Sequence, residues 1–337
     1  MNMPRQSNLE LLKIVAILMV IILHYFNADM GGGLKYVNSG TFNYYAMNYI
    51  ESLSIIAVNC FVLITGYFLT GKETIRVKKV IDLVFVTIFY GLLFFFFISK
   101  HQAISLQGVI HAAIPFYVSN WYVASYCALY MLSPFLNILI RQLTKGQFQQ
   151  LIIVGILFFS LVPTFLSKVS YNDNGYGVLS FLLLYCIGSY IKTYSVGNKS
   201  KWVYLTIYLL STTITFIIFN LAYNTIFTVI SSISLFLFFS KLSLHSKIIN
   251  YLASFTFAVY IIHTNEFFTN IIFHKILKTQ LFWNSSWFLL HIVFSVILVF
   301  IICMGIEIIR RMLAILLLGK IKIPFLEKLT VGTQKSF

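Results

Sequence analysis

Long apolar runs recur ten times along this sequence of 337 residues, and they limit the folds that the chain can adopt. Each run is 18 to 24 residues long, close to the length that an α-helix needs to cross a bilayer. The predicted spans are residues 9–26, 48–69, 80–98, 121–140, 150–167, 177–194, 202–220, 222–240, 249–268 and 286–309. Because backbone groups in lipid must be satisfied within the chain, the runs predict an all-α polytopic membrane bundle of about ten transmembrane helices.

The composition leaves little room for a soluble domain. Hydrophobic residues make up 59% of the chain and charged residues only 10%, whereas soluble domains are typically about 25% charged. We therefore expect residues 1–337 to form a single integral-membrane domain. The segment 103–118 is apolar but short and contains Pro115, so we expect it to be interfacial or re-entrant.

The net charge of +15 reflects membrane topology and not nucleic-acid binding, because the basic residues stand in short clusters between apolar runs. With the N-terminus inside, 19 of the 24 Lys and Arg residues fall on the inner side and 5 on the outer side. The positive-inside rule then predicts that both termini are cytoplasmic, in a multi-pass protein in contact with membrane lipids.

The sequence lacks the patterns that are typical of disulfides, metal sites and nucleotide-binding glycine loops. The four cysteines are far apart in apolar runs, which favours small buried side chains over disulfides or a metal site. No Rossmann or Walker glycine pattern is present. The run Gly31-Gly32-Gly33 predicts a flexible outer loop, not a phosphate cradle.

The first span carries three ionisable residues, Glu10, Lys13 and His24. At about 100° per residue they share one helix face, and His24 lies about 16 Å further along the axis than Lys13. Ionisable residues in a span usually face a polar cavity or a partner. A cleaved signal peptide is the alternative, but His24 to Asn27 do not resemble a cleavage site.

A basic cluster follows the second span. Lys72, Arg76 and Lys79 have the spacing of one helix face, with Lys78 beside them. Cations at a cytoplasmic helix end suit phosphate groups. The alternative is ordinary positive-inside topology with anionic lipid.

Two later spans carry polar stripes at helical spacing. In span four the stripe is Tyr126, Tyr130, Ser133 and Asn137, and Pro134 is expected to kink the helix. In span nine it is Thr256, Tyr260, His263 and Asn270. One such stripe is more often a helix–helix contact, but stripes that converge at the depth of His24 favour a polar cavity. We expect a cavity that opens inward near Arg76 and outward near His24, with walls formed by Lys13, His24, Tyr126, Tyr130, Tyr260 and His263.

Together these residues resemble the integral-membrane acyltransferase-3 family, which includes bacterial polysaccharide O-acetyltransferases. Lys13 and His24 match its basic-x10-His motif. The run from Asn59 to Tyr67 matches its second-span pattern, with Thr65 in place of Ser. The remaining matches are the cluster Arg76, Lys78 and Lys79, the run Trp121 to Pro134, and the set Thr256, Tyr260 and His263. Tyr126 stands where the family commonly has Glu, which removes an acid–base group from that position.

The resemblance implies acetyl-CoA as a cytoplasmic acyl donor, held by Arg76, Lys78 and Lys79 and used without a bound cofactor. It implies a polysaccharide or lipid-linked sugar as acceptor, in a bacterial cell membrane. His24 would act as a general base or form an acetyl-histidine, and Lys13 would contact the donor or bias His24. Cavity or acceptor positions are Glu10, Tyr67, Trp121, Tyr126, Tyr130, Tyr260 and His263.

Two alternatives stay open at this stage. A polysaccharide flippase or polymerase-like carrier is the competing function, although such a carrier should have more intramembrane charge or longer outer loops. His24 and Asp29 also form the H-x4-D pattern of glycerolipid acyltransferases, but no FPEGT-like segment follows.

Overall fold

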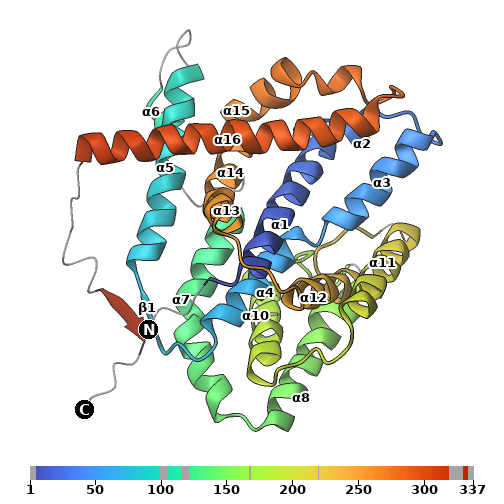
Figure 1. The fold of residues 1–337 in the computed structure, drawn as a ribbon, viewed down its shortest axis with the longest axis vertical. Coiled ribbons are helices and arrows are strands. Elements are labelled where there is room, and N and C mark those ends of the chain that lie inside the picture. The colour runs from blue at the N-terminus through green and yellow to red at the C-terminus, as the bar shows by residue number, and fades with distance from the viewer. Residues whose placement is uncertain are drawn as a thin grey trace. The chain divides into compact units, whose positions relative to one another are not determined.

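A computed structural model describes residues 5–98, 105–114, 121–166, 168–218, 220–318 and 329–332 (Figure 1). Within these residues the chain is helical apart from a two-stranded sheet. Seven helices are long and apolar enough to cross a membrane, and three shorter apolar helices accompany them. The prediction of an all-α polytopic membrane bundle is therefore confirmed.

Each predicted span coincides with a helix. The seven long ones are Ser7–Phe26, Phe42–Leu69, Lys78–Phe97, Trp121–Gln142, Lys145–Phe165, Lys201–Ile218 and Phe288–Leu316. The three predicted spans that fall on shorter helices correspond to Val178–Thr193, Ile226–Ser240 and Lys247–His263. Residues 220–225 separate the helices of the seventh and eighth predicted spans, and Thr225 caps the second of these helices by accepting from the backbone N–H of Thr228.

The chain divides into two compact units. Unit 1 comprises residues 1–57, 85–120 and 244–322, and unit 2 comprises 58–84, 121–243 and 323–337. The helices of unit 1 are α1 (Ser7–Phe26), α2 (Gly33–Tyr36), α3 (Phe42–Ser54), α6 (Leu106–Ala113), α13 (Lys247–Leu252), α14 (Thr256–His263), α15 (Glu266–Asn270) and α16 (Phe288–Leu318). In this unit α1 packs against α3, α13, α14 and α16, so the first span lies at its core.

Unit 2 holds most of α4 (Ala57–Leu69) and the start of α5 (Lys78–Ile98), which continues into unit 1. Its other helices are α7 (Trp121–Gln142), α8 (Lys145–Ile156), α9 (Val162–Phe165), α10 (Val178–Thr193), α11 (Lys201–Ile218) and α12 (Ile226–Ser240). Here α7 and α8 pack on α10, and α11 forms a hairpin with α12. The four cysteines are buried in the two units, as the sequence predicts.

The sheet joins distant parts of unit 2. Strand β1 (Thr74–Arg76) pairs antiparallel with β2 (Thr330–Gly332), and Ile75 lies opposite Val331. The segment after the last span thus lies beside the α4–α5 connection. That position requires an even number of crossings between the strands and supports the prediction of eight spans there.

The sheet also overturns one prediction. Arg76 lies on a strand, so Lys72, Arg76 and Lys79 do not share a helix face. Gly71 ends the preceding helix with φ of +76°, and the β-branched residues Thr74, Ile75 and Val77 favour the extended strand that pairs with β2.

Two further predictions are wrong in detail. The helix of span nine ends at His263, because Asn265 caps a new helix, so Asn270 does not continue the stripe. Gly31–Gly33 is not a flexible loop: all three residues are buried, and Gly33 begins α2. The single-domain organisation stays a prediction. Residues 103–104 and 115–118 of the expected interfacial segment lie outside the described residues, as do Lys100, Lys320, Lys322, Lys328 and Lys335.

Candidate functional site

A histidine pair occupies the core of unit 1. Nδ1 of His24, near the end of α1, lies 2.8 Å from Nε2 of His263, the last residue of α14. The rings are tilted by 46° with centroids 4.9 Å apart. His263 is fully buried, whereas His24 keeps partial exposure. Two residues 239 positions apart in the sequence therefore form one polar centre inside an apolar bundle.

The Val259 carbonyl determines which ring nitrogens of this pair carry protons. Nδ1 of His263 contacts the backbone oxygen of Val259, which only accepts, so this nitrogen carries a proton. In the neutral pair Nε2 of His263 is then an acceptor, and Nδ1–H of His24 donates to it. Nε2 of His24 is left with a free lone pair. The arrangement holds His24 in the tautomer that a general base requires.

The loop after α1 holds His24 in place. The carbonyl of Gly31 accepts from the Thr279 hydroxyl and from the Trp283 indole, both at 3.0 Å, while the Gly31 N–H donates to the His24 carbonyl. A Cβ at Gly31 would collide with the backbone of Tyr25, so only glycine fits here. The sequence pattern shows the glycines but not this contact.

A third histidine, which sequence reasoning missed, anchors the residue next to His24. The Tyr25 hydroxyl donates to Nδ1 of His291 at 2.8 Å, and Nε2–H of His291 donates to the Leu277 carbonyl. Phe282 stacks on the imidazole with ring centroids 3.7 Å apart. His291 follows a loop and lies in no polar stripe, so its spacing carries no signal.

The remaining predicted residues of unit 1 lie along the same elements. Lys13 forms an ion pair with Glu10 at 2.9 Å on α1. Tyr260 lies one turn before His263, with ring centroids 6.3 Å apart. Glu51, on α3, has one buried carboxylate oxygen without a hydrogen-bond partner in the structure.

The predicted stripe on α7 is the centre of unit 2. Tyr126 and Tyr130 stack with ring centroids 6.5 Å apart. The Lys79 ammonium donates to the Tyr126 hydroxyl at 3.2 Å and lies 4.6 Å from the Tyr130 ring centroid. Pro134 leaves the Tyr130 carbonyl without its usual helical donor, and the Ser133 hydroxyl donates to it at 2.7 Å. Sequence spacing thus identified a face that binds a cation.

Asn137, the last residue of the stripe, fastens three segments together. Its amide donates to the carbonyls of Leu69 and Lys72 at 2.7 and 2.8 Å, and its oxygen accepts from the Tyr185 hydroxyl on α10. The end of α4, helix α7 and helix α10 therefore meet at one buried side chain.

The predicted donor-binding residues differ in their surroundings. Arg76 is exposed on β1, and its backbone interacts with Tyr130. Lys78 is paired with Asp82 at 3.4 Å. Among the described residues no carboxylate lies within ion-pair distance of Arg76 or Lys79.

The other two predicted positions in unit 2 have aromatic surroundings. Trp121 packs edge-on against Tyr176 at 4.5 Å between ring centroids and also contacts Tyr223. Tyr67 packs against Phe236 of α12, and the ammonium of Lys192 lies 4.7 Å from its ring centroid.

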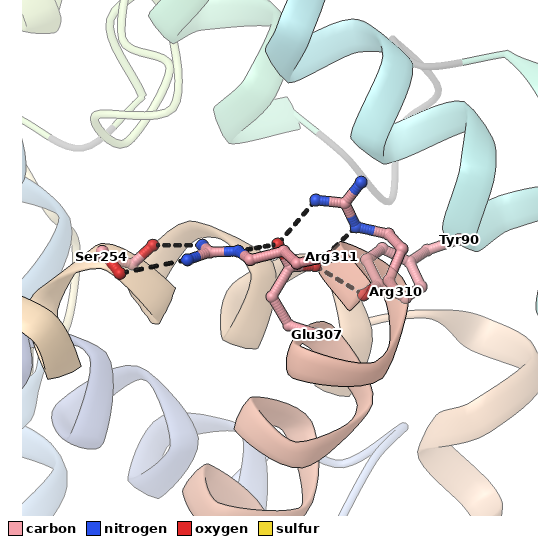
Figure 2. Close-up of polar contacts among 5 residues, drawn as sticks. All are labelled: Tyr90, Ser254, Glu307, Arg310 and Arg311. Carbon is pink, nitrogen blue, oxygen red and sulfur yellow. Dashed lines mark hydrogen bonds and ion pairs between the residues drawn. The ribbon is translucent and has the colours of Figure 1, made fainter. Parts of the chain in front are cut away.

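A second polar centre of unit 1 lies near the end of α16 and was also missed (Figure 2). Glu307 is buried, with a relative exposure of 2%, and its carboxylate accepts four hydrogen bonds at 2.7 Å. Arg310 supplies two, Arg311 one and the Tyr90 hydroxyl one. Arg311 also donates to the carbonyl and hydroxyl of Ser254. The sequence shows only a basic pair at a helix end.

The structure therefore sorts the predicted site residues into two sets. Unit 1 contains Glu10, Lys13, His24, Tyr260 and His263, and unit 2 contains Tyr67, Arg76, Lys78, Lys79, Trp121, Tyr126 and Tyr130. One cavity lined by both sets stays a prediction.

The long apolar helices define a polytopic membrane protein with polar centres inside its two units. The family model described as an acyltransferase domain, Acyl_transf_3, matches residues 6–307. The chain belongs to this acyltransferase-3 family and is a multi-pass membrane acyltransferase, which confirms the resemblance drawn from the motifs. No curated protein and no solved structure matches the chain significantly.

Proposed function

We propose that this protein transfers an acetyl group from cytoplasmic acetyl-CoA to a sugar hydroxyl of a cell-surface or exported polysaccharide. The observation that carries the proposal is the histidine pair, because its hydrogen bonds leave Nε2 of His24 as a proton acceptor. A base is what an alcohol needs to attack a thioester at neutral pH.

In the proposed reaction, Nε2 of His24 takes the proton of the sugar hydroxyl as its oxygen attacks the thioester carbonyl. The C–O bond forms, the C–S bond breaks, and the proton passes from His24 to the departing thiolate of CoA. His263 accepts from Nδ1–H throughout, and it holds the ring while stabilising the transient imidazolium. His24 is the catalytic residue, and His263 is a positioning residue.

The cations of unit 2 would bind the donor. Arg76 and Lys79 have no carboxylate partner in the described chain, and a phosphate would supply the missing negative charge. Lys78 is the weaker contributor, because Asp82 already pairs with it. The donor arm must reach His24 through a passage lined by protein, since acetyl-CoA is too polar to cross lipid. The reaction would take place in a bacterial cell membrane, with the donor on the cytoplasmic side and the acceptor on the outer side.

Membranes that contain the protein, incubated with [1-¹⁴C]acetyl-CoA and the host polysaccharide, test the proposal. We expect acceptor-dependent release of free CoA, and new O-acetyl signals in the NMR spectrum of the polysaccharide. Membranes with the His24→Ala variant are the control. A carrier without transferase activity would move the polysaccharide and release no CoA, which would contradict the proposal.

A further inference from the structure

Lys192, at the end of α10, shares with Lys79 a position on the face of a tyrosine ring. Its ammonium lies on the Tyr67 ring, 4.7 Å from the centroid, as Lys79 lies on Tyr130 at 4.6 Å. Both lysines lack a carboxylate within ion-pair distance among the described residues, whereas Lys13 and Lys78 each have one. A cation on an aromatic face still directs most of its N–H groups outward, where they can meet an anion.

The position of Lys192 is built into the fold by two glycines. A Cβ at Gly66 would collide with the Tyr185 carbonyl, and a Cβ at Gly188 would collide with the Leu63 carbonyl. Helices α4 and α10 therefore cross with their backbones in contact, which small residues permit. Lys192 lies one turn after Gly188, and Tyr67 directly follows Gly66, so the crossing brings the ammonium onto the ring.

The helix that carries Lys192 is linked to the segments that carry the cations of the proposed donor site. Asn137 links the end of α4, helix α7 with its two tyrosines, and Tyr185 of α10. Lys35 and Lys201 stack on the residue that follows them in sequence, which requires no tertiary contact. Lys145 lies on the Tyr194 ring at a longer distance, 5.4 Å from the centroid.

The charge of the donor calls for a further cation. CoA carries a diphosphate and a 3′-phosphate, about four negative charges at neutral pH. Arg76 and Lys79 supply two positive charges, while Lys78 is compensated by Asp82. We propose that Lys192, held on Tyr67, is an additional donor-binding residue that contacts a phosphate of acyl-CoA. The inference rests on the proposed use of an acyl-CoA donor and names a residue that none of the motifs contains.

Equilibrium binding to the purified full-length protein in detergent tests this inference, with CoA, 3′-dephospho-CoA and pantetheine as probes. We expect Lys192→Met to weaken CoA binding roughly ten- to a hundredfold, as loss of a charged hydrogen bond predicts, and to leave pantetheine binding unchanged. If the contact is to the 3′-phosphate, the variant and the wild type will bind 3′-dephospho-CoA equally. If it is to the diphosphate, the variant will bind 3′-dephospho-CoA more weakly.

Two further variants keep the result interpretable. Lys192→Arg should restore most of the CoA affinity, and Lys201→Met, which removes a cation from the Trp202 ring, should bind CoA like the wild type. Equal losses for CoA and pantetheine, or no loss for either, would overturn the role of Lys192. Failure of the wild type to bind CoA would instead overturn the proposed donor, and the inference with it.

Discussion

The two units hold their cations in different surroundings. In unit 1 the intramembrane cations are paired with carboxylates, Lys13 with Glu10 and the two arginines with Glu307. In unit 2, Lys78 and Arg141 are paired with Asp82 and Glu73, whereas Lys79 and Lys192 lie on tyrosine rings, with no carboxylate within ion-pair distance among the described residues. A paired cation is electrostatically satisfied and holds structure, whereas a cation on an aromatic face retains its attraction for an anion.

The histidine pair of unit 1 adds to this difference between the units. The centre of unit 1 is a pair of imidazoles anchored on the Val259 carbonyl, and in its neutral form it carries no charge. We therefore assign proton transfer to unit 1 and donor binding to unit 2, and four variants test this division.

The largest effect is expected from His24→Ala. Loss of the base should lower acetyl transfer about 10²- to 10⁴-fold, with the protein still in the membrane and CoA binding unchanged. The measurement is O-acetyl content by NMR at matched protein level, with His274→Ala as a control at an exposed histidine. Wild-type levels of O-acetylation in the His24→Ala variant would contradict the assignment of proton transfer to unit 1.

Glu307→Ala should lower the stability of unit 1, because it leaves two arginines without their buried carboxylate partner. Breaking a buried pair typically costs about 3–5 kcal/mol, so a clear fall in Tm is expected in detergent. Glu266→Ala breaks the more exposed pair with His111 and should cost at most about 1 kcal/mol. Equal Tm values for the two variants would show that burial of the Glu307 carboxylate is not what stabilises α16.

Neutralising Arg76 and Lys79 together should raise the KM for acetyl-CoA by roughly one to two orders of magnitude, since each loses a charged contact to phosphate. The kcat should change little, because these residues lie outside the histidine unit. Lys145→Met, at the start of α8, is the control for lost charge. A fall in kcat with unchanged KM would contradict the assignment of donor binding to unit 2. A variant that changes only the orientation of the protein in the membrane would show that Arg76 and Lys79 set topology and do not bind the donor.

The smallest effect is expected from Tyr130→Trp. A larger ring on the α7 face should narrow the donor passage and lower transfer several-fold without changing Tm by more than a few degrees. Tyr130→Phe keeps the aromatic face under Lys79 and should remain close to wild type. If Tyr130→Trp leaves acetyl transfer unchanged while Tyr130→Phe lowers it, transfer depends on the Tyr130 hydroxyl and not on the width of the passage.

Sequence patterns were sufficient wherever the physical rule is local. Lipid requires a helix from any apolar run of sufficient length, so the helices coincide with the predicted spans. Helical spacing likewise placed Tyr126, Tyr130 and Asn137 on one face, and basic-x10-His placed Lys13 and His24 on another. The chain's membership of an acyltransferase family followed from the order of those motifs.

Only the tertiary structure determined which side chains and backbone groups contact each site residue. The imidazole of His24 has a defined tautomer only because His263, which the Val259 carbonyl orients, lies against it from more than 200 residues away in the sequence. The strand at Arg76 depends on pairing with Thr330–Gly332, and the place of Lys192 depends on the crossing at Gly66 and Gly188. Periodicity within a helix says which side chains share a face, but a hydrogen bond or a counter-charge depends on which other helix packs there.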